Sequence, residues 1–158
     1  MKREMVVNNQ IKEFLLSANT RGYGSADVNE EKLPNGEHII RFSDDTFEFK
    51  DIYYGGEPYA GQEVIFEHGG KAIWAMQYRG EVAGNEVSAI YAFLGRVLTN
   101  TKLGLPRGVD GYHDSEFSYK FRMDGGLESF TAEERILRGD ETVYSAKFLG
   151  GLVDRGGE

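Results

Sequence analysis

FEFKDIYYGG, residues 47–56, returns seventy residues later as FSYKFRMDGG, residues 117–126. Residues 42–80 align without gaps on residues 112–150. The eight identities are Asp44/Asp114, Phe47/Phe117, Lys50/Lys120, Gly55/Gly125, Gly56/Gly126, Glu63/Glu133, Gly69/Gly139 and Gly80/Gly150. Further upstream, Ile11-x-x-Phe14-Leu15 matches Ile90-x-x-Phe93-Leu94 in the same order. This collinear pattern predicts a fold that uses one structural unit twice.

Each unit begins with a helical pattern and continues with strand patterns. Ile11, Phe14, Leu15 and Ala18 share one helical face, and residues 87–98 carry a broader apolar face. Residues 117–124 alternate between apolar and polar side chains, as expected for a strand with one buried face. Gly69-Gly70 and Gly139-Asp140 predict tight hairpin turns with positive φ.

We therefore predict an α+β fold in which a helix-plus-antiparallel-meander unit (α-β3/4) occurs twice and the sheet curves around two helices. The prediction is a single domain over residues 1–150, with repeats at about 8–80 and 85–150 and a flexible tail at 151–158. The connection 20–37 is longer than most, which is typical either of a lid or of a simply mobile loop.

Composition narrows the classes of function. The formal net charge of −8 disfavours direct nucleic-acid binding, because phosphate backbones are also negative. The chain has no cysteine, which excludes disulfides, thiol catalysis and zinc–thiolate sites. No apolar run approaches the roughly 20 residues of a membrane helix, and the N-terminal residues lack a signal-peptide pattern. We expect a cytoplasmic protein without a membrane partner; the sequence leaves its oligomeric state open.

Catalytic signatures are not found. The sequence has no Gly-x-Ser-x-Gly, Walker or His-Glu-x-x-His motif, and its three histidines lack the spacing of a metal pair. The adjacent carboxylates Asp44-Asp45 and Glu133-Glu134 would point to opposite faces of a strand, so turn or solvent positions are predicted for them. We expect no catalytic residue, no metal and no cofactor.

The segment YYGGEPYAGQEV, residues 53–64 within the longer run 33–66, resembles a prokaryotic family of domains of unknown function. Members of that family are free-standing or lie behind a repressor-type helix-turn-helix. The resemblance implies that such a domain can accompany a DNA-binding module, and it implies no activity, ligand or catalytic residue. This chain shows no helix-turn-helix of its own.

Differences between the two repeats point to a binding site. Asp51 occupies a row of aromatic residues, whereas the aligned residue in the second repeat is Phe121. A carboxylate among aromatic side chains is costly unless it is paired or hydrated. One interpretation is that a bulge or strand end turns Asp51 outward, or that Arg41 or Arg79 pairs with it. The other interpretation is that Asp51 lines a pocket.

The aromatic residues Tyr53, Tyr59 and Trp74 also gather in the first repeat, where they serve either the core or a ligand. We predict a non-enzymatic small-molecule-binding or sensing domain of unknown ligand. Asp51, Tyr53, Tyr59 and Trp74 are its predicted ligand-binding residues. A protein–protein interaction module is the alternative, and an enzyme of unknown reaction comes third.

Overall fold

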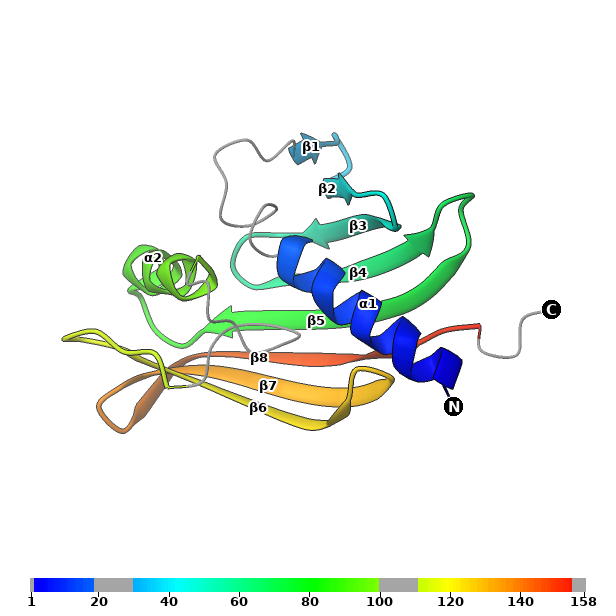
Figure 1. The fold of residues 1–158 in the computed structure, drawn as a ribbon. Coiled ribbons are helices and arrows are strands. Elements are labelled where there is room, and N and C mark those ends of the chain that lie inside the picture. The colour runs from blue at the N-terminus through cyan, green and yellow to red at the C-terminus, as the bar shows by residue number, and fades with distance from the viewer. Residues whose placement is uncertain (1, 19–29, 100–110, 155–158) are drawn as a thin grey trace.

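Eight antiparallel strands form one continuous sheet (Figure 1). The computed structural model describes residues 2–18, 30–99 and 111–154. The strands are β1 (Glu30–Lys32), β2 (His38–Ser43), β3 (Phe47–Tyr54), β4 (Tyr59–Glu67), β5 (Ala72–Val82), β6 (Ser118–Gly126), β7 (Ser129–Arg138) and β8 (Glu141–Leu152). Their order across the sheet is β1-β2-β3-β4-β5-β8-β7-β6.

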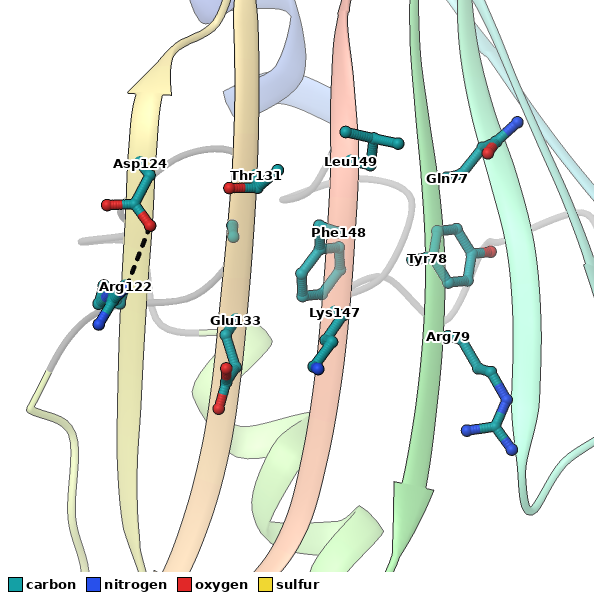
Figure 2. A pocket seen from close by; sticks show the side chains of 11 residues that line it. Gln77, Tyr78, Arg79, Arg122, Asp124, Thr131, Glu133, Lys147, Phe148 and Leu149 are labelled. Atoms are coloured by element: carbon teal, nitrogen blue, oxygen red, sulfur yellow. Dashed lines mark hydrogen bonds and ion pairs between the residues drawn. The ribbon is translucent and has the colours of Figure 1, made fainter.

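Two helices, α1 (Lys2–Ala18) and α2 (Val87–Leu98), cover one face of this sheet. We call this the inner face; Figure 2 looks onto the opposite, outer face, and both helices lie behind the sheet. Phe14 of α1 packs edge-on against Phe47, with ring centroids 5.5 Å apart. Phe93 of α2 packs on Phe117 at 5.4 Å. The helices thus bury matching phenylalanines at the starts of the two meanders.

The prediction of an α+β fold with a sheet curved around two helices is wrong, because the protein is mainly β. The helices have only 17 and 12 residues, whereas β5 and β8 alone have 11 and 12. Apolar periodicity predicted both helices where they occur. It carries no information about how few of the residues are helical. β5 and β8 are this long because their pairing continues through the glycines at positions 80 and 150.

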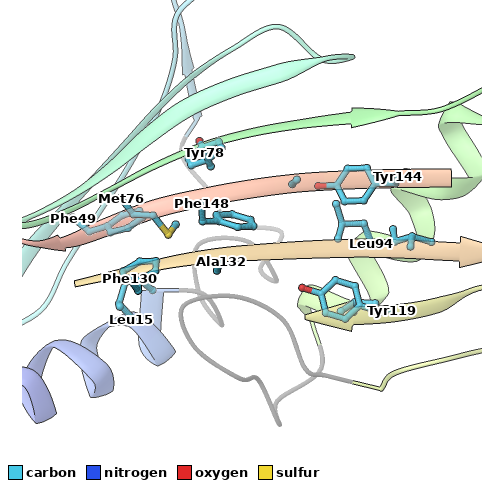
Figure 3. Packing of buried hydrophobic residues seen from close by; sticks show 14 of the residues in the cluster. Leu15, Phe49, Met76, Tyr78, Leu94, Tyr119, Phe130, Ala132, Tyr144 and Phe148 are labelled. Carbon is cyan, nitrogen blue, oxygen red and sulfur yellow. The ribbon is translucent and has the colours of Figure 1, made fainter. Parts of the chain in front are cut away.

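The core lies between the helices and the inner face (Figure 3). In that view Leu15 comes from α1 and Leu94 from α2, while the strands supply the aromatic rings. Trp74, Tyr119 and Tyr144 are among the largest fully buried side chains. Burial of such rings contributes much of the hydrophobic stabilisation, since each removes a large apolar area from water.

The two meanders meet where β5 pairs with β8. We call β3–β5 the first half of the sheet and β6–β8 the second half. Tyr78 and Phe148, which the sequence alignment matches, are direct partners across this antiparallel pairing. Their ring centroids lie 6.3 Å apart. Matching residues therefore face one another at the centre of the sheet.

The same turn opens each half. The Oδ1 atom of Asp44 accepts hydrogen bonds from the backbone N–H groups of Thr46 and Phe47, at 2.7 and 2.9 Å. The Oδ1 atom of Asp114 accepts two equivalent bonds from Glu116 and Phe117, both 2.8 Å long. This local bonding is a physical reason for aspartate at both positions.

Strand register shows that the ungapped alignment is wrong across β7. Asp51 of β3 lies opposite Glu63 of β4, whereas Phe121 of β6 lies opposite Glu134 of β7. The counterpart of Glu63 is therefore Glu134, at an offset of 71, and not Glu133. Asp51 and Glu63 are 12 positions apart in the sequence, whereas Phe121 and Glu134 are 13 apart. The next pairs reverse this difference, since Glu63 and Met76 are 13 positions apart and Glu134 and Ala146 are 12 apart. Single-residue shifts like this one move a side chain to the other face of a sheet.

The predicted glycine turns are confirmed. Gly69, Gly70 and Gly139 have φ values of 106°, 97° and 60°, and they connect β4 to β5 and β7 to β8. Within the predicted connection 20–37, residues 20–29 lie outside the described residues, and residues 30–32 form β1. In the predicted tail, β8 runs to Leu152 and residues 155–158 lie outside the described residues. Neither described helix is long and apolar enough to cross a membrane.

Asp114 gives a prediction about stability and pH. Hydrogen bonds from the backbone of Phe117 and then Glu116 hold the pKa of Asp114 below its ordinary value. A lowered folded-state pKa stabilises the fold at neutral pH, and this contribution disappears as pH falls through that pKa. Asp114→Asn should therefore lower the urea midpoint at pH 7, and the difference from wild type should vanish near about pH 2.

The measurement is urea unfolding at both pH values, with the fluorescence of Trp74 as the signal. Asp45→Asn, at an exposed position in the turn of the first half, is the control and should leave the midpoint near wild type. A difference for Asp114→Asn that persists undiminished in acid would contradict this assignment.

Candidate functional site

Three acidic side chains are buried on the inner face. Asp51, Glu63 and Glu134 are only 1%, 2% and 0% exposed. Burying a carboxylate is costly unless hydrogen bonds or opposite charges compensate. These positions therefore mark where the chain accepts a cost to stability that an apolar residue would avoid.

Glu134 is held by tyrosines. Tyr119 and Tyr144 donate their hydroxyls to its two carboxylate oxygens at 2.6 and 2.7 Å. The hydroxyl of Tyr144 also contacts the hydroxyl of Tyr59 in a short hydrogen bond. Since Tyr144 has only one hydroxyl proton and gives it to Glu134, Tyr59 must be the donor in that bond. A chain of hydrogen bonds thus links Tyr59 of β4 to Glu134 of β7.

Asp51 lies in the first half and faces inward. Its Oδ1 atom accepts a hydrogen bond of 2.5 Å from the hydroxyl of Tyr78. Its cross-strand partner is Glu63, so two carboxyl groups occupy neighbouring inner positions. The interpretation that Asp51 turns outward is contradicted by its burial. Arg41 and Arg79 form exposed ion pairs with Glu31 and Glu81, at 2.9 and 3.4 Å.

A cavity of about 220 Å³ lies beside Asp51. We call it the Asp51 cavity. Its walls come from β2, β3, β4, β5, α2 and the β3–β4 connection. The lining residues are Ile40, Asp51, Tyr53, Gly55, Gly56, Tyr59, Tyr78 and Leu98.

Two glycines leave room for the tyrosine rings against the sheet. Tyr78 lies opposite Gly61, where an added Cβ would come within 2.4 Å of its Oη atom. Tyr59 lies opposite Gly80, where an added Cβ would come within 2.6 Å of its ring. Such contacts are impossible without displacement, so glycine at 61 and 80 shapes the cavity wall. The two rings stand 5.9 Å apart and are tilted by 56°.

The rim of the cavity is fixed by other polar contacts. Tyr53 stacks on His38, with ring centroids 4.6 Å apart, and donates its hydroxyl to Glu30. Tyr91 of α2 donates to Glu57 in the β3–β4 connection at 2.7 Å. Burial, followed by this bond to Glu57, raises the pKa of Tyr91 well above its ordinary value. Tyr91 is therefore a neutral hydroxyl that ties α2 to the glycine-containing connection.

The structure brings together three of the four predicted site residues, since Asp51, Tyr53 and Tyr59 line one cavity. Trp74 is elsewhere: it is fully buried, stacks on Phe130 and donates its Nε1–H to the carbonyl of Leu127 at 2.9 Å. Trp74 is thus a core residue. A binding role for the other three stays a prediction.

Sequence reasoning missed Tyr78 and Glu134. The prediction that both members of the Glu133-Glu134 pair occupy turn or solvent positions is wrong for Glu134. The inward orientation of Glu134 follows from strand alternation, because Phe130, Ala132 and Ile136 are all buried at two-residue spacing on the same strand. Tyr78 could not be found from local spacing, because its bond to Asp51 joins residues 27 positions apart.

A larger hollow of about 610 Å³ lies on the outer face (Figure 2). Its polar lining comes from neighbouring strands and includes Arg79, Arg122, Asp124, Glu133 and Lys147. Arg122 and Asp124 form an exposed ion pair at 3.2 Å. Exposed pairs of this kind contribute little and need no ligand. The chemistry of the Asp51 cavity, with its buried carboxyl group, makes it the stronger candidate site.

No group of three or more potential metal-ligating side chains is found in the described parts of the chain. The chemistry that the cavity does offer is one buried carboxyl group, three tyrosine rings and two apolar side chains, Ile40 and Leu98.

These features define a mainly-β domain with one acidic, aromatic cavity on its helix-covered face. Residues 51–153 match DUF5680, a domain of unknown function, and the chain belongs to this family. The matched region begins at Asp51 and includes most of the cavity wall, but not Ile40 of β2. Comparisons with curated proteins and with solved structures gave no match.

The tyrosine chain gives a second prediction. Tyr119→Phe removes one donor to Glu134 and should lower the free energy of unfolding by roughly 1–3 kcal/mol. Tyr144→Phe should cost more, because it also removes the acceptor for Tyr59. Chemical unfolding of the two variants, which delete the same atom from the same cluster, measures the difference. Equal losses would show that the Tyr59–Tyr144 bond contributes nothing.

Proposed function

We propose that this protein is a non-enzymatic small-molecule-binding domain whose ligand occupies the Asp51 cavity. The observation that carries the proposal is a carboxyl group, 1% exposed, in the wall of an aromatic cavity. The fold itself does not demand an acid there, because Phe121 fills the corresponding position in the second half. A residue that departs from the local pattern at a stability cost is typical of a functional position.

A sensing role extends this proposal. The resemblance to prokaryotic domains that stand alone or follow a repressor-type helix-turn-helix supports it by analogy. In such an arrangement, ligand binding between the sheet and α2 would alter the packing of α2. A change at that helix is a route by which occupancy of the cavity reaches a neighbouring module.

A second candidate function is protein interaction through the outer face. A hollow of about 500 Å³ there is lined by Ile52, Tyr54, Val64 and Phe66, among others. Tyr54 is 48% exposed, and Leu149 of β8, whose cross-strand partner Gln77 also lines this hollow, is 59% exposed. Exposed aromatic and aliphatic side chains of this kind are typical of protein interfaces.

The test of the proposed function is a thermal-shift screen with small metabolites. A ligand present at about 100 times its dissociation constant should stabilise the protein by roughly 2.7 kcal/mol. Asp51→Asn keeps an oxygen that can accept from Tyr78 but removes the charge. We expect it to weaken binding of any hit about ten-fold or more, with little change in the fold.

Glu133→Gln is the matched control, since it removes a half-exposed carboxylate from the outer face. It should bind the hit as wild type does. If Asp51→Asn also bound every hit like wild type, the ligand would not occupy the Asp51 cavity. Loss of binding in Tyr54→Ser instead would support the outer face.

A further inference from the structure

We infer that the ligand of the Asp51 cavity is a small organic cation, such as an alkylammonium ion. This inference rests on the proposed function and adds the chemical class of the ligand. Four observations support it: where the tyrosine protons point, where the carboxyl groups lie, how the aromatic rings are arranged, and how large the cavity is.

The hydroxyl protons of the cavity tyrosines are already committed to the protein. Tyr78 donates to Asp51, Tyr53 donates to Glu30, and Tyr59 donates to Tyr144. The remaining side chains of the lining, Ile40 and Leu98, are apolar. Among the described lining residues, the side chains therefore offer acceptor oxygens and ring surfaces. A ligand that suits them supplies hydrogen-bond donors or positive charge.

The two neighbouring carboxyl groups favour a positively charged ligand. Asp51 and Glu63 are direct cross-strand partners, both buried on the inner face. Two ionised carboxylates in this position would repel each other, and burial would strengthen the repulsion, so such a pair keeps a proton unless a cation lies beside it. A bound cation next to Asp51 would offset this repulsion, whereas a neutral ligand would not. None of the described residues that line the cavity has a basic side chain.

The aromatic walls suit the same ligand. Tyr59 and Tyr78 are tilted relative to each other rather than stacked, so they form two walls that meet at an angle. Cations are attracted to the faces of aromatic rings within about 6 Å of the centroid, and the attraction strengthens in desolvated sites. The rings thus provide contact area and electrostatic stabilisation together.

The volume of the cavity suits a small ligand. About 220 Å³ is the volume of roughly seven water molecules in the liquid. Pockets for drug-sized molecules start at roughly 300 Å³. A compact amine or quaternary ammonium ion therefore fits better than a nucleotide or an oligosaccharide.

The test uses probe pairs that differ in charge but little in shape. Choline is compared with 3,3-dimethyl-1-butanol, and n-butylamine with n-butanol, by calorimetric titration of the full-length protein at pH 7. We expect wild type to bind at least one cation about ten-fold more tightly than its neutral partner. Asp51→Asn should remove that preference, Glu63→Gln should reduce it, and Glu133→Gln should preserve it.

The outcomes separate this inference from the proposed function. A preference for the cation that depends on Asp51 supports both. If a neutral hit from the metabolite screen binds with dependence on Asp51 while neither cation binds, the proposed function stands and the cation inference is overturned. If neither the probes nor the screen gives binding that depends on Asp51, both are overturned. The comparison of charged and neutral probes on wild type remains decisive even if a variant fails to fold.

Discussion

The pairing of β5 with β8 is the interaction on which the rest of the structure depends. It joins the meander β1–β5 to the meander β6–β8 in one sheet, with Tyr78 opposite Phe148. Because the inner rows of both halves then lie side by side, Tyr59 of the first half reaches Tyr144 of the second. Neither the continuous core nor the hydrogen-bond chain to Glu134 would exist if the halves folded separately.

Burial of carboxyl groups on that joined face sets the second constraint. Glu134 is satisfied by two tyrosine hydroxyls, and Asp51 accepts from a third. The tyrosines reach these positions because glycine at 61 and 80 leaves room for their rings. The halves differ at one inner position: the first has an acid beside a cavity where the second has Phe121. This asymmetry is what the proposed function uses.

Local patterns predicted part of this arrangement well. The glycine turns at 69–70 and 139–140 and the helical faces around Phe14 and Phe93 follow from spacing of a few residues, whereas that spacing left the orientation of Asp51 open. The α+β prediction failed because periodicity shows where a helix forms, not how much of the sheet it covers. The ungapped alignment failed at β7 because matched glycines and acids do not reveal a one-residue shift in strand register.

By itself, then, the sequence determined the repeat, the turns and the unusual place of the Asp51 carboxyl group in a row of aromatic residues. These features depend on glycine conformation, strand alternation and carboxylate desolvation, which act over a few neighbouring residues. Only the tertiary structure decided that Glu134, and not Glu133, is the buried acid, and that Tyr78 replaces Trp74 in the cavity wall. Both depend on the register between strands. The bond between Tyr59 and Tyr144 joins residues 85 positions apart, and no local rule specifies a contact at that separation.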